Sequence, residues 1–374
     1  MYCQFGNIGL QSPKIENLIP KPSSINDLNP FQQHQNNSYN PNRNTNTNPN
    51  AQIERHQREE PQRKAQLLEL QKDLEEIRKQ PNHNQKRSIS PFTKEEIAKI
   101  KADKELIFST FDTLKDILAN KPNTSLSDVF YLTEKAWGNS YISKAEYDQI
   151  INNSVDFIKK WMKQEKLSLS NQDNIHFAIQ NFMSKTLSIS ETKKSKDGKY
   201  ISKNIIHNPF FYDYQDYNAF EDHRNFFVTK CIATGSGQCK SLPLVYLILA
   251  ERLGAKAYLS ITPNHSFVKY SNNNGEIENY EPTSNWKLSN QWYIDNFRIN
   301  ERAIATGLYL DTLSKQQIIA DNLIDLAFFY IRKIPLNKEN FLSKLLMEVD
   351  KYYPKGNNEM TYHIYKSYLE GLLE

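Results

Sequence analysis

Residues 231–283 read CIATGSGQCKSLPLVYLILAERLGAKAYLSITPNHSFVKYSNNNGEIENYEPT. Within this stretch, Leu242 to Leu253 is almost wholly apolar and predicts a buried helix that Gly254 closes as a C-terminal cap. Pro243 falls in the first turn, where its missing N–H costs nothing. Cys239 is therefore expected at the N-terminal end of this helix, where the helix dipole and the terminal N–H groups favour the nucleophilic thiolate.

Three strands are predicted after this helix. Ala257 to Thr262 forms the first strand, and His265 to Tyr270 continues after a Pro-Asn turn. The sequence Asn-Asn-Asn-Gly at 272–275 is a strong turn signal, so Glu276 to Tyr280 is expected to return as an antiparallel strand.

The hairpin register predicts a catalytic pairing. With the turn centred near residue 273, His265 faces Glu281 to within one position. A histidine beginning one strand then meets a carboxylate at the end of the next, with Cys239 aimed from a helix N-terminus. These are the base, orienting group and nucleophile of a catalytic triad.

Other residues near the triad have less specific interpretations. Asn279 is an alternative third member of a papain-like kind, and Glu278 is a weaker one. Gln238 either contributes to an oxyanion site with the backbone N–H of Cys239 or only shapes the turn. Cys231, eight residues before Cys239, is expected to be buried and inert.

These motifs resemble the transglutaminase-like superfamily. The resemblance covers roughly residues 200–290 and lies in Gly237-Gln238-Cys239, Pro263-Asn264-His265 and Tyr280-Glu281-Pro282-Thr283. It implies a papain-like fold with Cys239, His265 and Glu281 as the catalytic residues. Nothing in the sequence supports a calcium site. The acid is Glu where the family usually has Asp, and Lys240 stands where true transglutaminases carry Trp. The resemblance therefore implies a non-cross-linking, bacterial-type member.

The same loop has a second reading as a phosphate-binding loop, because Gly235-Ser236-Gly237 and Lys240-Ser241 precede a helix. A P-loop needs glycine directly before its lysine and again six residues before it, and here those positions hold Cys239 and Thr234. We therefore reject phosphate binding.

The composition changes along the chain near residue 93. Residues 1–92 are expected to be a disordered polar tail, because eleven of the twenty positions from 31 to 50 are Asn or Gln. One amphipathic helix or short coiled-coil seam is predicted within this tail, at residues 62–80.

The remaining chain is predicted to form three parts of an α+β protein. A helical subdomain at 93–198 contains helices at 93–120, 125–137, 144–165 and 174–186. The transglutaminase-like core occupies 199–290, and its aromatic-rich beginning (199–222) either lines a cleft, forms two short strands or packs in the core. A helical region at 291–374 follows, with helices at 313–333, 339–351 and 359–374 that vaguely resemble helical-repeat hairpins.

Composition and charge exclude several classes of protein. No window holds about 18 consecutive apolar residues, so no membrane span is expected. A net charge of +4 over 374 residues is too dilute to indicate nucleic-acid binding. Three cysteines make neither a disulfide framework nor a four-cysteine zinc site, and no metal or cofactor is expected. No signal peptide is readable, which favours a cytoplasmic location.

Two functions follow from these patterns. The first is a thiol hydrolase or acyltransferase that attacks an amide or ester carbonyl through Cys239, with a protein or peptide as substrate. The second is an interaction protein that binds a protein partner through its helical regions around a papain-like scaffold. The intact triad favours the first.

Overall fold

The structure is a computed structural model of the chain, and it describes residues 92–121, 123–138, 141–194, 197, 200–217, 219, 221–305, 307–335 and 340–353. From Lys94 on, the described residues fall within one compact unit. The predicted N-terminal tail with its helix at 62–80, and the predicted helix at 359–374, lie outside the described residues.

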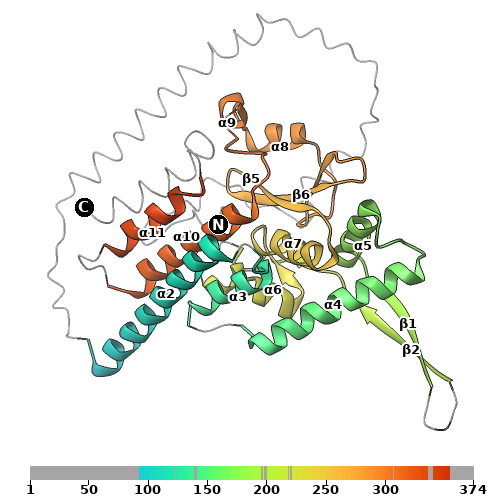
Figure 1. Ribbon diagram of the computed structural model, residues 1–374, viewed down its shortest axis with the longest axis horizontal. Helices are drawn as coiled ribbons and strands as arrows, with labels where there is room; N and C mark the ends of the chain where they lie inside the picture. The colour runs from blue at the N-terminus through green and yellow to red at the C-terminus, as the bar shows by residue number, and fades with distance from the viewer. Residues whose placement is uncertain are drawn as a thin grey trace, which may run out of the picture. The chain divides into compact units, whose positions relative to one another are not determined.

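Four helices form the first part of this unit (Figure 1). They follow the predicted ranges to within two residues at each end, because apolar residues recur at helical spacing and polar side chains cap the ends. In α4, for example, Ser143 and Glu146 form a capping box, and Tyr147, Ile151 and Val155 lie on one buried face. The four helices are α2 (Lys94–Asn120), α3 (Leu126–Lys135), α4 (Lys144–Gln164) and α5 (Gln172–Ser184).

A two-stranded antiparallel hairpin, β1 (Leu187–Lys194) and β2 (Tyr200–His207), follows α5 and projects beside α4 (Figure 1). Among the hairpin residues whose burial is described, Leu187 and Ile189 are buried, and Ser188 between them is exposed. The sequence interpretation extended a helical subdomain to residue 198, whereas this hairpin spans that boundary. Short polar strands contain few apolar residues, so their alternating pattern is harder to recognise in the sequence than the pattern of the neighbouring helices.

The helix α7 (Ser241–Leu253) lies at the centre of the core and confirms the predicted helix. Eleven of its thirteen residues are buried, which explains why it is apolar on all sides. It packs against α3, α4, α5, α6 (Val228–Thr234), β5 (Ala257–Thr262) and β6 (His265–Ser271). Gly254 ends it in the left-handed conformation, with φ of 74°. Before α6 come a short strand, β3 (Phe211–Tyr212), and the 3-10 turn η4 (His223–Phe226); after α6 comes β4 (Ser236–Gly237).

The main sheet has the strand order β5-β6-β7 and is antiparallel throughout. Its strands are β5 (Ala257–Thr262), β6 (His265–Ser271) and β7 (Ile277–Tyr280), and all three confirm the predicted strands. The register differs from the prediction by two residues. Val268 faces Tyr280, so continuing the ladder would set Thr283, and not Glu281, opposite His265.

The turn explains this difference. The backbone N–H of Asn272 donates to the carbonyl of Glu276, which leaves a three-residue loop centred on Asn274. Gly275 takes φ of +82° at the end of this loop, as three-residue hairpin loops require. A shift of two residues keeps every side chain on its face of the sheet. His265 and Glu281 therefore remain diagonal neighbours on one face.

The chain after the sheet is helical, as predicted. The helix α10 begins with a capping box of Ser314 and Gln317 and packs between α2 and α11, on the left of Figure 1. Lys315 of α10 pairs with Glu251 of α7 at 2.6 Å, and Lys333 pairs with Asp103 of α2 at 3.1 Å. The helices are α8 (Asn290–Phe297), α9 (Glu301–Ala305), α10 (Lys315–Lys333) and α11 (Phe341–Asp350).

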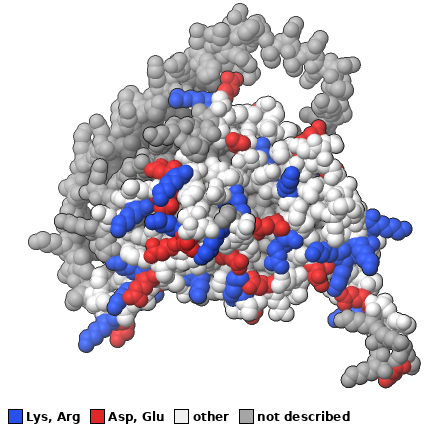
Figure 2. All heavy atoms as spheres, in the orientation of Figure 1, with Lys and Arg blue, Asp and Glu red and all other residues white. Residues whose placement is uncertain are grey.

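The surface that Figure 2 shows carries basic and acidic side chains in alternation, without a large area of one sign. This distribution fits the small net charge of +4. Within the part of the chain that the structure describes, no helix is long and apolar enough to cross a membrane.

Candidate active site

Cys239 lies in the turn directly before the buried helix α7, two residues ahead of its first residue, Ser241. The N–H of Leu242 donates to the carbonyl of Gln238 at 2.9 Å, so the helical hydrogen bonding begins at Gln238. The hydroxyl of Ser241 accepts from the N–H of Gln238 at 3.0 Å and closes this turn. Cys239 itself is 5% exposed, and its sulfur is held in a disulfide bond, so a thiol forms there only on reduction. The predicted position of the cysteine at a helix N-terminus is confirmed.

The turn before Cys239 has no room for a side chain at Gly237. A Cβ placed there would lie 2.5 Å from the Sγ of Cys231 and 2.7 Å from the Oγ of Ser241. Cys231 is a buried free thiol, and burial raises its pKa to about 12. Glycine at 237 therefore lets α6 approach the turn that carries Cys239 closely.

His265 begins β6 and contacts Glu281. Its Nε2 lies 2.7 Å from Oε2 of Glu281. Glu281 follows the last residue of β7 and forms an isolated bridge with Trp286. The contact crosses the sheet diagonally, and diagonal neighbours are within reach of long side chains. The extra methylene that Glu has over Asp suits this diagonal reach.

The carboxylate of Glu281 is almost fully enclosed and has donors on both oxygens. The N–H and hydroxyl of Thr283 donate to Oε1 at 3.1 and 2.6 Å, and the hydroxyl of Tyr293 donates to Oε2 at 3.0 Å. Burial opposes ionisation, but the charge of His265 and the hydrogen bonds from His265 and Thr283 outweigh it and lower the pKa of Glu281. An ionised carboxylate only accepts, so Nε2 of His265 carries the hydrogen and Nδ1 is left as the basic nitrogen.

Two further residues hold His265, and neither was singled out in the sequence. The ring of Phe297 in α8 stacks on the imidazole, with centroids 5.2 Å apart. Ser266 donates its hydroxyl to the backbone carbonyl of Cys239 at 2.5 Å. Because Ser266 directly follows His265, this bond joins the backbone of β6 to the turn before α7.

Gln238 is fully buried, and its Nε2 donates to the carbonyl of Asp216 at 3.1 Å. The amide thus joins the turn before Cys239 to the segment after β3, which favours the turn-shaping alternative. Asn279 donates to the carbonyl of Leu288 and to Oδ1 of Asn290, both at 2.9 Å. Glu278 binds Tyr270 and Lys287, and mainly Lys287 lowers its pKa to about 2. None of these contacts involves His265.

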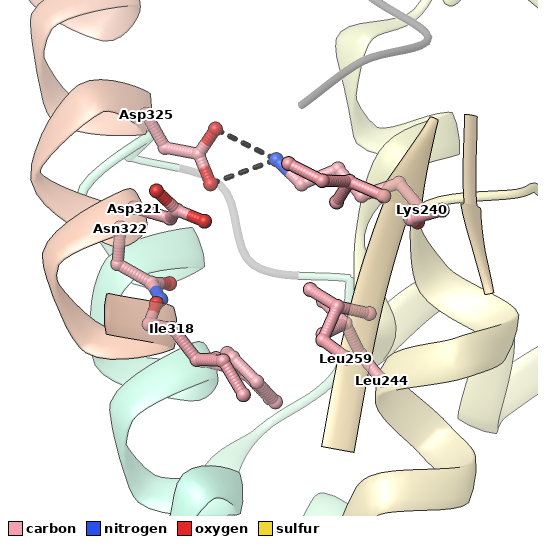
Figure 3. A pocket seen from close by; sticks show the side chains of 10 residues that line it. Lys240, Leu244, Leu259, Ile318, Asp321, Asn322 and Asp325 are labelled. Atoms are coloured by element: carbon pink, nitrogen blue, oxygen red, sulfur yellow. Dashed lines mark hydrogen bonds and ion pairs between the residues drawn. The ribbon is translucent and has the colours of Figure 1, made fainter. Parts of the chain in front are cut away.

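Lys240 points towards Asp325 of α10 (Figure 3). Its Nζ lies 2.6 and 2.7 Å from the two carboxylate oxygens of Asp325. The pair borders a cavity of about 40 Å³ that Ser266, Asp321 and Asn322 also line. This volume holds a water molecule or two and excludes an organic substrate. With Lys240 bound to a carboxylate and the hydroxyl of Ser241 bound to the N–H of Gln238, the loop does not form a phosphate cradle.

Among the residues that the structure describes, no group of three or more His, Cys, Asp or Glu side chains is arranged to hold a metal ion.

A cysteine in the turn before a buried helix and a His–carboxylate pair on an antiparallel sheet form the arrangement that the resemblance to papain-like enzymes implies. Residues 191–319 match the family model described as the transglutaminase-like superfamily, so the chain carries a transglutaminase-like domain there. This match extends past both ends of the stretch expected from sequence, 200–290, and includes the end of β1, all of β2 and the start of α10. No curated protein and no solved structure matches the chain.

Proposed function

We propose that the protein is a cysteine enzyme that attacks an amide or ester carbonyl through a triad of Cys239, His265 and Glu281. The observation that carries this proposal is the 2.7 Å contact between His265 and Glu281, held beside the turn of Cys239 by the Ser266 hydrogen bond. We propose that the enzyme does not cross-link proteins. This fits the presence of Lys240 at the position after the cysteine, where its side chain binds Asp325 of α10.

The reaction begins with proton transfer. In the reduced protein, Nδ1 of His265 takes the thiol proton of Cys239, and Glu281 stabilises the imidazolium that results. The thiolate sulfur then attacks the carbonyl carbon, and the C–N or C–O bond of the substrate breaks while His265 returns the proton to the leaving group. Water or an amine, deprotonated by His265, attacks the thioester and releases the acyl group and the Cys239 thiol.

Alkylation of Cys239 by iodoacetamide tests the proposal. The reduced protein is alkylated across a range of pH, and peptide mapping separates Cys239 from the other thiols. An activated thiol reacts well below pH 8, because its thiolate is stabilised. We expect Cys239 to behave in this way and buried Cys231 to remain unmodified.

Two variants complete this test. His265→Ala should shift the reactivity of Cys239 towards that of an ordinary thiol, whose pKa is about 8.5. Glu281→Gln should keep the fold and impair turnover of amide and ester libraries, with Cys239→Ala as the inactive control. A wild-type thiol that reacts no faster below pH 8 than an ordinary one contradicts the proposal.

A second function, binding of a protein partner through the helical regions, is favoured by a hollow between α2 and α11. Phe108, Phe111 and Phe341 line it together with Lys104 and Lys344, and its volume is about 530 Å³. A partner that binds there should bind the Cys239→Ala variant as well as the wild type. An enzyme substrate would instead accumulate on that variant and turn over on the wild type.

A further inference from the structure

The aromatic segment at residues 211–217 runs directly beside the turn that carries Cys239. Phe211 and Tyr212 of β3 pair in parallel with Ser236 and Gly237 of β4. The N–H of Asp213 donates to the carbonyl of Gly237 at 2.7 Å. The Gln238 amide then holds the carbonyl of Asp216, as described above. Gly237 and Gln238 are the two residues before Cys239.

The outer edge of this strand is open. Phe211 and Asp213 direct their N–H groups to β4, at 2.8 and 2.7 Å from the carbonyls of Gly235 and Gly237. Backbone groups alternate along a strand, so the N–H and C=O of Tyr212 point to the opposite side. Within the described residues, this sheet consists of β3 and β4 alone. An open edge of this kind is the template on which an extended peptide adds as a further strand.

Aromatic side chains cover this edge. Phe211, Tyr214 and Tyr217 are exposed, and Tyr214 reaches 76%. The rings of Tyr212 and Tyr214 are edge to face, with centroids 4.8 Å apart. Burial raises the pKa of Tyr212 to about 12, and the nearby groups that add to it include Tyr214 and Glu281. The tyrosine side of the edge therefore lies close to the candidate triad.

The segment is also acidic, in a chain whose net charge is +4. Residues 211–222 contain four carboxylates and no Lys or Arg. Lys230 pairs with Asp213, and Arg224 pairs with Asp222 at 2.7 Å. Even with these two cations, the excess is negative, and Glu221 is exposed. Exposed tyrosine faces within a negative field attract ammonium and guanidinium groups.

We propose that the open edge of β3 binds an extended peptide that carries Lys or Arg side chains, and that this peptide flanks the carbonyl presented to Cys239. Only the attack of Cys239 on the peptide carbonyl rests on the proposed function; binding of the peptide to β3 does not. Main-chain hydrogen bonds to Tyr212 supply affinity for any extended peptide, while the aromatic and acidic side chains select basic ones.

Fluorescence anisotropy with the Cys239→Ala variant of the full chain tests this site without turnover. The probe is a fluorescein-labelled peptide of about ten residues in which Lys and Val alternate around a central Gln, a length that spans the edge with room to extend beyond it. Saturable binding is expected, weakened about tenfold or more when Glu replaces Lys, because the segment repels carboxylates. A probe N-methylated at alternate backbone nitrogens should bind weakly, since it cannot pair with Tyr212.

Tyr214→Ala and Tyr200→Ala form the matched pair of protein variants. Tyr200 lies on the β1–β2 hairpin and is 74% exposed, close to the 76% of Tyr214. Only Tyr214→Ala should weaken binding. Each of three outcomes overturns the inference: no saturable binding of the Lys probe, equal binding of the Lys and Glu probes, or binding that N-methylation does not weaken. If the peptide does not bind but Cys239 is alkylated well below pH 8, this inference fails and the proposed function stands. If the peptide binds specifically but Cys239 reacts like an ordinary thiol, the proposed function fails and the binding site stands.

Discussion

A single hydroxyl group connects the two residues that must exchange a proton. Ser266 lies on β6 next to His265, and its bond to the Cys239 carbonyl crosses from the sheet to α7. Small displacements between a nucleophile and its base cost large factors in rate. Ser266 thus acts as a positioning residue in the proposed mechanism, although it touches no substrate.

We predict that Ser266→Ala shifts the alkylation profile of Cys239 towards higher pH and slows alkylation at neutral pH by about tenfold, the effect of about one unit in the thiol pKa. Ser266→Thr keeps the hydroxyl and should restore the profile. Ser260→Ala is the control, because Ser260 is equally buried in the neighbouring strand and its hydroxyl has no hydrogen-bond partner among the described residues. A profile that stays unchanged in Ser266→Ala would show that the bond has no part in positioning.

The close approach at Gly237 leads to a second prediction at this scale. Gly237→Ala forces its Cβ against Cys231 and Ser241, so one of these must move. We expect a loss of about 1–3 kcal/mol in the free energy of unfolding, typical of overpacking, together with slower alkylation of Cys239. Cys231→Ala in the same chain should recover part of both losses.

Gly275→Ala is the control for Gly237→Ala, because it strains the backbone of a turn without pushing a side chain against the residues around Cys239. Gly275 has φ of +82° and open space around its Cβ position, and it lies in the β6–β7 turn. Its substitution should lower the melting temperature while leaving Cys239 alkylation as in the wild type. Equal alkylation in Gly237→Ala and Gly275→Ala would contradict a role for the close packing at 237.

At the scale of elements, the pair of Lys240 and Asp325 fixes α10 to the turn of Cys239. The side chains are 14% and 10% exposed, so both charges are largely withdrawn from water. We predict that Asp325→Leu alone lowers the free energy of unfolding by about 3–5 kcal/mol, because it leaves Lys240 buried without a counter-charge.

The double variant Lys240→Met with Asp325→Leu should recover most of this loss, since a well-packed apolar pair replaces a buried ion pair at little cost. Urea unfolding of the four proteins in the cycle measures the coupling. Additive single losses would show that the two side chains act independently, and that α10 is held by its apolar contacts alone.

The elements that position the site were largely predictable, and the contacts that complete it were not. The helix α7 and the strands β5 to β7 follow from local patterns of apolar residues, glycine and asparagine, and the order of Cys239, His265 and Glu281 along the chain led to their grouping. Ser266, Asp325 and Tyr293 acquire meaning only from tertiary contacts, which no period in the sequence encodes.

The hairpin β1–β2 was missed for a different reason. Its signal is present, because Leu187 and Ile189 alternate with polar residues and Asp197-Gly198 is a turn dipeptide. These lysine-rich strands have few apolar residues, so their alternating pattern is weak. The helical pattern of α5, which ends three residues before β1, is stronger and was extended over them. The predicted pairing of β6 with β7 was wrong by two residues, because the loop length was assumed. The predicted face of each side chain was still right, because only a shift by an odd number of residues moves side chains to the other face.

At the scale of the whole molecule, composition divides the chain near residue 93, which leads to a prediction about its N-terminal part. Deleting residues 1–90 should change the melting temperature by no more than a few degrees, because the Asn- and Gln-rich composition offers little apolar surface for packing. Thermal unfolding of the two chains compares them directly. A larger drop would show that this part stabilises the domain.

Whole-molecule stability should also depend on pH through a buried histidine far from the triad. His223 of η4 is enclosed by the rings of Trp137, Phe227 and Phe329. Burial lowers its pKa from the usual 6.5 to about 3, and Lys240 and Arg332 act in the same direction, while Asp325 opposes them. In the unfolded chain the imidazole regains its usual pKa, so between pH 6.5 and 3 the unfolded state binds the extra proton. Stability from this residue is therefore complete above pH 6.5 and is lost as the pH falls.

We predict that acidification from about pH 7.5 to about pH 5 costs the wild type about 2 kcal/mol more than it costs His223→Phe, since one and a half pH units lie below the unfolded pKa. Phenylalanine fits an aromatic surrounding and cannot take up a proton. Other titrating groups, such as buried Glu134, whose pKa burial raises to about 7, affect both proteins alike and cancel in the difference. Urea unfolding at both pH values measures it, and parallel losses in the two proteins would mean that His223 is protonated in the folded state.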